Sequence, residues 1–231
     1  MVDDPLRVPS PALMRVLRSA ARLQELVPDA VLVGGSAAAL YAGHRDSYDH
    51  DHVLVDLADR FDAVLEAVES QDGWVTNRVT PGKIGELGGI ETGIRQLIRR
   101  TPLETVRIEL PSGESVTAPT PEETLRVKAF LILRRNQTRD YLDVAALADQ
   151  MGIEHAAVTL SGVDEYYADQ HQGGDGVASQ LVRQLAEPAP TDRSSTRSLR
   201  QYKNLAARWQ EWDEVVSVCR SLATTMVRGL C

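Results

Sequence analysis

The residues most able to do chemistry lie near the start of the chain, where Gly34-Gly35-Ser36 is followed by Asp49 and Asp51. The glycines come after an apolar run and open a predicted helix, so their backbone can approach a phosphate and the helix start can offer free N–H groups. Asp49 and Asp51 flank one residue at the start of a strand, whose two-residue period places both carboxylates on one face. Such a pair repels unless a cation lies between, and oxygen ligands favour Mg²⁺ or Mn²⁺. The order of these residues favours metal-assisted phosphoryl chemistry.

The same stretch permits a second interpretation, a metal-dependent phosphohydrolase, because His and Asp side chains together bind transition metals. Such hydrolases draw further ligands from distant helices, and two more histidines lie further along the chain. The residues concerned are His44, Asp46, His50, Asp51 and His52, with His155 and His171 as the distant candidates. The spacing of these last two fits no ligand pattern of that class.

Composition and charge limit the class of protein. The chain has 231 residues, of which 43% are hydrophobic and 25% charged, which suits a globular domain with a self-sufficient core. The net charge of -8 argues against a DNA coat or a membrane-surface protein. There is no long apolar run or signal-peptide pattern, and Cys219 and Cys231 alone cannot form a disulfide framework or a four-ligand zinc site. We expect a cytoplasmic protein with no membrane partner.

Hydrophobic periodicity predicts α/β structure followed by a helical half. The expected helices cover 11–27, 37–41, 58–70, 121–135, 137–150, 154–169, 176–187 and 198–228, and the expected strands cover 30–33, 52–55, 74–79, 94–98, 105–110 and 115–117. A loop is expected over 187–198. The first seventy residues are acidic, whereas 95–139 is rich in arginine, which is compatible with an RNA backbone.

Two blocks of the sequence, 30–57 and 118–150, resemble the AbiEii/AbiGii-type nucleotidyltransferase toxins, which belong to the DNA polymerase β-like nucleotidyltransferase superfamily. The first block reads Gly34-Gly35-Ser36, then Gly43-His44-Arg45-x-Ser47-x-Asp49-x-Asp51 before an apolar strand. The second reads Thr120-Pro121-Glu122-Glu123-Thr124-Leu125-Arg126-Val127-Lys128, then Arg134-Arg135-x-x-x-Arg139-Asp140-Tyr141-x-Asp143-Val144-x-x-Leu147. It is similar to the family's Lys helix and Arg-Asp-x-x-Asp-Leu helix.

The resemblance implies an α/β (α+β) fold: a small twisted mixed β-sheet nucleotidyltransferase core over 1–118, with helices on one face, and a C-terminal helical bundle over 119–231 that completes the active-site cleft. It also implies an enzyme that transfers NMP from an NTP to an acceptor and releases pyrophosphate, with Mg²⁺ or Mn²⁺ as cofactor. In the family's toxins the acceptor is often the tRNA 3′ end, and the partner is a cognate antitoxin.

The same resemblance assigns roles to individual residues. The glycine turn and a nearby hydroxyl would hold the nucleotide, two carboxylates would hold the metal, and basic residues would contact phosphate. The catalytic candidates are Asp49, Asp51, Lys128 and Asp140; the nucleotide-binding candidates are Gly34, Gly35, Ser36, Ser47 and Arg139; the metal ligands are Asp49 and Asp51; and Arg45 and Asp143 are supporting residues.

Two departures from the family pattern stand out. A third strand carboxylate is usual in the superfamily, and Glu109 is the best candidate for it, although this residue on its own fits an exposed strand carboxylate without catalytic role better. His50 and His52 stand where apolar residues are expected, which allows an altered metal preference or a degenerate site. The alternatives to a tRNA-modifying toxin are therefore a small-molecule (antibiotic-type) nucleotidyltransferase, a catalytically inactive member that binds a partner protein, and the His/Asp phosphohydrolase.

Overall fold

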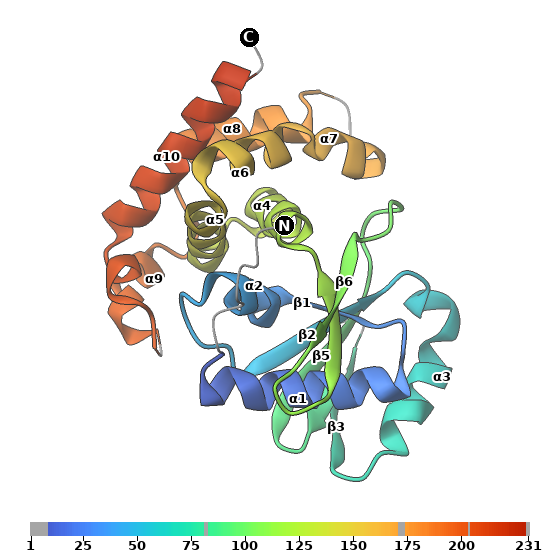
Figure 1. The fold of residues 1–231 in the computed structure, drawn as a ribbon. Coiled ribbons are helices and arrows are strands. Elements are labelled where there is room, and N and C mark those ends of the chain that lie inside the picture. Colours follow the sequence, from blue (N-terminus) through green and yellow to red (C-terminus); the bar gives the residue numbers. More distant parts are fainter. Residues whose placement is uncertain (1–8, 81–82, 171–173, 203, 230–231) are drawn as a thin grey trace. The chain divides into compact units, whose positions relative to one another are not determined.

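The computed structural model describes residues 9–80, 83–170, 174–202 and 204–229 (Figure 1). His171 and Cys231 lie outside these residues. The chain divides into two compact units. One comprises the described residues up to Leu40 together with Asp46–Thr120; the other comprises Tyr41–Arg45 and the described residues from Pro121 onward.

The first unit is built on a mixed five-stranded sheet, as the sequence predicts. Its strands follow the order β1-β2-β5-β4-β3, in which β2 and β5 run parallel and the other neighbours run antiparallel. The strands are β1 (Val31–Val33), β2 (Asp49–Leu54), β3 (Trp74–Thr80), β4 (Lys83–Leu87) and β5 (Ile90–Gln96). A separate antiparallel pair consists of β6 (Thr105–Glu109) and β7 (Ser115–Pro119).

Helices α1 (Pro11–Leu26) and α3 (Leu57–Glu69) supply the apolar core of this unit. Pro11 at the helix start and the side chain of Ser10, which accepts a hydrogen bond from the Leu13 N–H, fix where α1 begins. The core joins residues of both helices to inward-facing strand residues; its members are Leu23, Val27, Ala30, Leu54, Leu57, Val64, Val68, Leu87 and Ile94. Successive strand residues point to opposite faces of the sheet, so the strand residues that alternate with these core positions point to the face away from this core.

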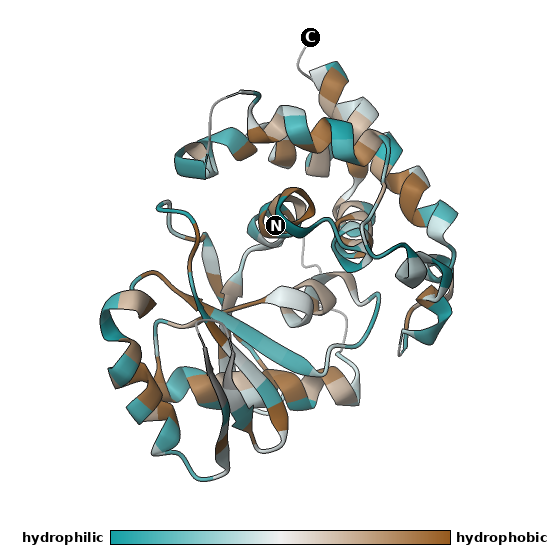
Figure 2. Cartoon of the chain, turned by 180° about the vertical axis from the view of Figure 1, so that it is seen from behind, coloured by the Kyte–Doolittle hydropathy of each residue, from teal (hydrophilic) through white to brown (hydrophobic). Residues whose placement is uncertain are grey.

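The second unit is helical and matches the predicted helical half, with the addition of Tyr41–Arg45, which begins with the last two residues of α2 (Gly34–Ala42). Its helices are α4 (Pro121–Arg135), α5 (Thr138–Met151), α6 (Ile153–Ser161), α7 (Val163–Tyr166), α8 (Val177–Ala186), α9 (Arg193–Arg197) and α10 (Trp212–Gly229), with short 3-10 turns at η1 (Ala168–Gln170), η2 (Leu199–Gln201) and η3 (Ala207–Gln210). Figure 2 shows hydrophilic and hydrophobic residues alternating along α10, as one buried stripe requires. Cys219 lies in that stripe and is fully buried, as expected.

Several predicted boundaries were wrong. The helix expected over 198–228 begins only at Trp212, because Asn204 takes a positive φ of 54° that no helix continues through. The helix expected over 154–169 ends before Gly162, a poor helix former. The loop expected over 187–198 contains α9, and β4 was not expected at all. None of the helices in the described residues has the length and apolar character needed to cross a lipid bilayer.

Candidate active site

The glycine turn joins β1 directly to α2 (Gly34–Ala42). Gly34 has a positive φ of 76°, which a side chain makes costly, and a Cβ placed there would lie 3.1 Å from Oδ2 of Asp51. Glycine is therefore needed at this position for two reasons, the backbone conformation and the close approach of a carboxylate. The turn and the second carboxylate, which the sequence singled out separately, come together in the first unit.

A substitution at this turn separates the two reasons. Gly34→Ala should lower the free energy of unfolding by about 1–2 kcal/mol, because a left-handed conformation costs this much for a residue with a Cβ. It should also lower nucleotidyl transfer, since the new methyl group crowds Asp51. Gly113→Ala is the control, because Gly113 also has a positive φ, of 95°, but has nothing within 4 Å of the added Cβ. Urea unfolding should show similar losses in both variants, and equal transfer rates in both would contradict the prediction.

Two serine hydroxyls of the site donate hydrogen bonds to Asp49. The hydroxyl of Ser36, which is buried in α2, donates to the main-chain carbonyl of Asp49 at 2.5 Å. The hydroxyl of Ser47 donates to the Asp49 carboxylate oxygen Oδ1 at 3.0 Å. Both hydroxyls thus fix the backbone and the carboxylate of Asp49. Contact between a nucleotide and either serine stays a prediction. The same holds for contact between a nucleotide and Gly35, which lies in the first turn of α2.

Asp49 and Asp51 share one face of β2, as the two-residue period predicts. Asp49 is exposed and Asp51 is partly exposed, whereas the two histidines between and after them are buried on the opposite face. Oδ1 of Asp51 lies 3.5 Å from the guanidinium of Arg95 on the neighbouring strand. The face with the glycine turn therefore presents two carboxylates and a cation, while the other face belongs to the core.

Glu109, the candidate for a third carboxylate, lies on a different sheet from Asp49 and Asp51. Glu109 lies on β6, in the two-stranded sheet, and its side chain is 73% exposed beside Arg107. It does not join Asp49 and Asp51 in any group of three or more metal-ligating side chains among the described residues. Glu91 lies directly opposite Asp49 in the parallel β2–β5 register, on the same face, although it too forms no group of three metal-ligating side chains with Asp49 and Asp51 among the described residues. Sequence reasoning missed Glu91, since nothing local reveals which strand pairs with β2.

The donor chemistry of this face fits a hard divalent cation. Asp49 and Asp51 offer carboxylate oxygens on one side of the sheet, and the small Gly34 leaves room beside Asp51. These two residues would hold Mg²⁺ or Mn²⁺. The histidines fit a metal less well, because His50 and His52 contact each other and α1 on the buried face. Across the described part of the chain, no His, Cys, Asp and Glu side chains gather as the phosphohydrolase interpretation requires.

The buried histidines of β2 make the first unit sensitive to acid. Burial lowers the pKa of His50 to about 4, against which the charge of Asp49 acts only weakly. Its Nε2 lies 3.0 Å from the Ser19 hydroxyl and 3.2 Å from that of Thr92, while its Nδ1 lies 3.4 Å from Nδ1 of His52. The imidazole therefore stays neutral in the folded protein at neutral pH.

The free energy of unfolding should fall as the pH falls from about 6.5 to 4, because His50 binds a proton in the unfolded chain but stays neutral in the folded protein. This residue should lower the free energy of unfolding by about 3 kcal/mol by the time the pH reaches 4, and none of that loss is present above pH 6.5. Unfolding by urea at several pH values should show a flatter profile for His50→Gln than for the wild type. The control is His155→Gln, because His155 is exposed beside Glu122. Identical profiles in wild type and His50→Gln would refute this assignment.

In the second unit, four residues from three segments form one buried cluster around Asp143. Its Oδ2 accepts from Nζ of Lys128 at 2.7 Å and from Nη2 of Arg45 at 3.1 Å. Its Oδ1 lies 2.8 Å from Nε2 of His44 and 3.0 Å from Nε of Arg45. Lys128, Asp143 and His44 are each at most 2% exposed. The segment 41–45 and helices α4 and α5 are thus joined at a single carboxylate.

The charges in this cluster are set by burial and by its own pairs. Burial alone would raise the pKa of Asp143, but the charges of Arg45 and Lys128 and the hydrogen bond from His44 hold it well below its usual value. Burial lowers the pKa of His44 despite its bond to Asp143. His44 is therefore neutral, with its proton on Nε2 toward the carboxylate, and its buried Nδ1 has no hydrogen-bond partner among the described residues. Two cations face one anion, so the cluster keeps a positive charge.

Two acidic residues of α5 have contacts that differ from the roles expected for them. Asp143, expected as a supporting residue, contacts Lys128, whereas Asp140, expected as catalytic, is bound by Arg135 at 2.6 and 2.8 Å. Residues three apart on a helix differ by about 60° in direction, which is enough to reach different partners. The neighbouring Arg139 is exposed. Asp140 therefore does not share a partner with Lys128.

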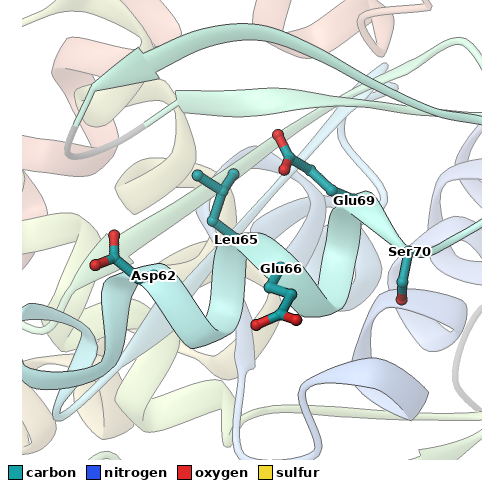
Figure 3. Close-up of a pocket in the computed structure, with 5 residues that line it drawn as sticks. All are labelled: Asp62, Leu65, Glu66, Glu69 and Ser70. Atoms are coloured by element: carbon teal, nitrogen blue, oxygen red, sulfur yellow. The ribbon is translucent and has the colours of Figure 1, made fainter.

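A shallow hollow also lies along α3, lined by Asp62, Leu65, Glu66, Glu69 and Ser70 (Figure 3). Figure 3 shows its carboxylates leaving a single helix toward different sides. The glycine turn and the β2 carboxylates do not line it. This hollow is therefore separate from the candidate active site.

Comparison with known protein families gives one match that covers most of the chain. Residues 15–216 match the family described as "Nucleotidyl transferase AbiEii toxin, Type IV TA system". This range includes the glycine turn, both β2 carboxylates and the whole cluster around Asp143.

Among curated proteins, the chain is similar to the heme uptake protein MmpL11 of Mycobacterium tuberculosis (strain H37Rv), with 33% identity over 243 aligned positions. The alignment covers 95% of this chain and 23% of that protein. The mycolic acid-containing lipids exporter MmpL11 of Mycolicibacterium smegmatis is 40% identical over 129 positions, which are 56% of this chain and 13% of that protein. The chain thus spans less than a quarter of the length of these relatives.

Solved structures of low sequence identity are also similar. A nucleotidyltransferase candidate from Helicobacter pylori is 15% identical, with a TM-score of 0.49 and coverage of 94% of both chains. An antigenic nucleotidyltransferase-like protein from Paracoccidioides brasiliensis is 18% identical, with a TM-score of 0.44, and covers 75% of this chain and 94% of its own.

Proposed function

The chain belongs to the AbiEii family of nucleotidyl transferases, and from this premise we propose that it transfers a nucleoside monophosphate from an NTP to an RNA hydroxyl with the help of a divalent metal. The observation that supports this most is the joint placement of the Gly34 turn and the Asp49–Asp51 pair, with Asp51 against Gly34. Backbone donors at a helix start and paired carboxylates are the two elements that a triphosphate with its metal needs.

The first unit would bind the nucleotide. In this proposal the turn at Gly34, Gly35 and Ser36 receives the phosphates, and Asp49 and Asp51 hold Mg²⁺ or Mn²⁺. The chemistry that such an ion supplies is neutralisation of charge on the phosphates as pyrophosphate leaves. Ser47 and Ser36 support this by fixing Asp49 in place through its carboxylate and its carbonyl.

The second unit would supply positive charge for the triphosphate. Within the four residues of the cluster, Lys128 and Arg45 carry two positive charges, Asp143 carries one negative charge and His44 is neutral. The cluster itself is therefore positively charged, in a buried setting where charges interact strongly. We assign Lys128 the role of stabilising the triphosphate and Asp143 the role of holding Lys128 and Arg45. Asp140 is reassigned to a structural pair with Arg135.

The reaction balances as a single substitution at phosphorus. The acceptor hydroxyl oxygen forms a bond to the α-phosphorus, and the bond from that phosphorus to the oxygen bridging the β-phosphate breaks. Pyrophosphate leaves with the bridging oxygen and the bond electrons. The hydroxyl proton passes to a carboxylate, for which Glu91 is the candidate because it shares the face of Asp49.

The acceptor and the biological role are further parts of the proposal. The family description names a toxin of a type IV toxin–antitoxin system, which supports a toxin with a cognate antitoxin as partner. We propose the tRNA 3′ end as acceptor, which would place the reaction in the cytoplasm. A small-molecule acceptor remains the alternative that the experiment must address.

The test uses the purified chain with each of four labelled NTPs, Mg²⁺ and total tRNA, resolved on a denaturing gel. Label should enter the tRNA with at least one NTP and should disappear when EDTA removes the metal. A parallel reaction offers an aminoglycoside in place of tRNA. Label in the aminoglycoside alone would replace the RNA acceptor, and label in neither, with every NTP and metal, would overturn the proposal.

A further inference from the structure

The second unit carries a basic surface that includes Arg139, which the sequence offers as a nucleotide-binding candidate, and that is otherwise separate from the proposed site. It consists of Arg139 on α5 and Arg193 and Arg197 on α9, together with Tyr202, which follows α9 in the chain; we call it the α9 surface. All three arginines are exposed, and Tyr202 is half-buried. In the sequence, the segment 188–206 has four basic residues against the single acidic Asp192, in a chain whose net charge is -8.

Hydrogen bonds fix α9 at the start of α5. Oδ1 of Asp192 accepts from the Thr138 N–H at 2.7 Å and from the Thr138 hydroxyl at 2.8 Å. The N–H of Thr191 donates to the carbonyl of Asn136 at 2.8 Å. Figure 1 shows α9 close to α5, against which it packs. Since Arg139 follows Thr138 and Arg193 follows Asp192, the anchor holds their backbones side by side.

The arginines of the α9 surface are not used inside the protein. Arg139, Arg193 and Arg197 take part in none of the ion pairs between described residues, whereas Arg200 nearby pairs with Glu211 and Arg208 pairs with Asp149. The anchoring carboxylate of Asp192 is occupied by Thr138. Exposed guanidinium groups without acidic partners are available to an external anion.

This surface continues toward the Asp143 cluster. Tyr202 lies near enough to Arg45, Arg139 and Asp143 to feel their charges, and burial raises the pKa of its phenol. The carbonyl of His44, in the cluster, accepts from the N–H of Ala206, four residues after Tyr202. Tyr202 therefore lies within electrostatic range of both Arg45, which holds Asp143, and the exposed Arg139.

We propose that the α9 surface binds the phosphate backbone of the RNA acceptor and leads it toward the Lys128–Asp143 cluster. This inference rests on the proposed function, in that the acceptor is RNA. Arginines four residues apart on a helix lie about 5–6 Å apart at their Cβ atoms, so Arg193 and Arg197 can contact successive backbone phosphates. A single nucleotide needs no such extended row, and a small-molecule acceptor would not use it.

The test measures binding separately from catalysis. Arg193→Gln/Arg197→Gln removes two charges at exposed positions, and Arg220→Gln/Arg228→Gln removes two from exposed positions on α10 as the matched control. Fluorescence anisotropy with labelled total tRNA, without NTP, should show affinity weakened about 10-fold or more in the first variant at low salt. The slope of log Kd against log salt should fall by about 1.5–2, because two phosphate contacts are lost. The control variant should bind as the wild type.

Transfer assays then separate this inference from the proposed function. With tRNA as acceptor, Arg193→Gln/Arg197→Gln should raise KM for tRNA about 10-fold while kcat at saturating tRNA and the KM for NTP stay at wild-type values. If the wild type labels tRNA but this variant matches the control variant in affinity and salt slope, the α9 surface is refuted and the proposed function stands. If the wild type labels no RNA in the presence of every NTP and metal, the proposed function itself fails and this inference with it.

Discussion

Asp49→Asn is expected to lower nucleotidyl transfer by on the order of 10²–10³-fold or more while leaving the protein folded. The amide oxygen can still accept the hydrogen bond that Ser47 donates to Oδ1, and the backbone carbonyl still accepts from Ser36. What the variant loses is a negative charge on the exposed face of β2. Since that negative charge attracts a metal ion bound there, the affinity for Mn²⁺ should fall in parallel. Titration followed by electron paramagnetic resonance measures this affinity directly.

Asp62→Asn is the matched control for this prediction. Asp62 is a carboxylate on α3, where it lines the hollow of Figure 3. The same chemical change there should leave transfer and Mn²⁺ affinity at wild-type values. If Asp49→Asn retained wild-type transfer, the β2 pair would not be the metal site. Equal losses in the two variants would mean that the effect comes from overall charge.

The second large effect is on stability. Asp143→Asn should reduce the free energy of unfolding by about 3–5 kcal/mol, because it leaves Lys128 and Arg45 buried near a neutral amide. The low pKa of Asp143 means that its stabilising contribution is present above the ordinary carboxylate pKa and is lost only at strongly acidic pH, as the folded carboxylate takes up its proton. Urea unfolding at pH 7 should show the whole loss.

Asp140→Asn provides the comparison on the same helix. Asp140 is equally buried, but its partner Arg135 is 29% exposed and can regain water when the carboxylate is gone. Lys128→Met should also cost less than Asp143→Asn, because Asp143 keeps Arg45 and His44. If Asp140→Asn and Asp143→Asn destabilised the protein equally, Asp143 would have no special place in the cluster.

The parts of the site predicted correctly from the sequence were those that local periodicity determines. A turn of two glycines between a strand and a helix, and two carboxylates separated by one strand residue, define a face before any tertiary contact forms. The same periodicity explains His50 and His52, which looked like departures from the family pattern. They are polar residues on the core face, where His50 contacts Ser19, Thr92 and His52, while Nε2 of His52 has no hydrogen-bond partner among the described residues.

The parts that were missed depend on contacts between distant segments. The sequence offers Glu109 and not Glu91 as a candidate for the third carboxylate, because it does not reveal that β5 pairs in parallel with β2. The choice between Asp140 and Asp143 required knowing which of them reaches Lys128, and a helical wheel leaves both within about 60° of each other. The short helix α9 lies where the sequence predicts a loop, because the hydrogen bond that fixes it joins Asp192 to Thr138, 54 residues away.

The segment Tyr41–Arg45, at the end of α2, affects how this chain folds during synthesis and where it can be cut. It lies in sequence between two parts of the first unit, yet it is counted with the second, so the polypeptide passes between the units three times. On the ribosome, His44 and Arg45 emerge about a hundred residues before the carboxylate that they bind, a contact with a sequence separation of 98–99 residues. Such distant closure slows folding and leaves both side chains without their partner in the nascent chain. For the same reason, a fragment that ends at Thr120 would not be an independent half of the molecule, because it would contain two residues whose partner it lacks.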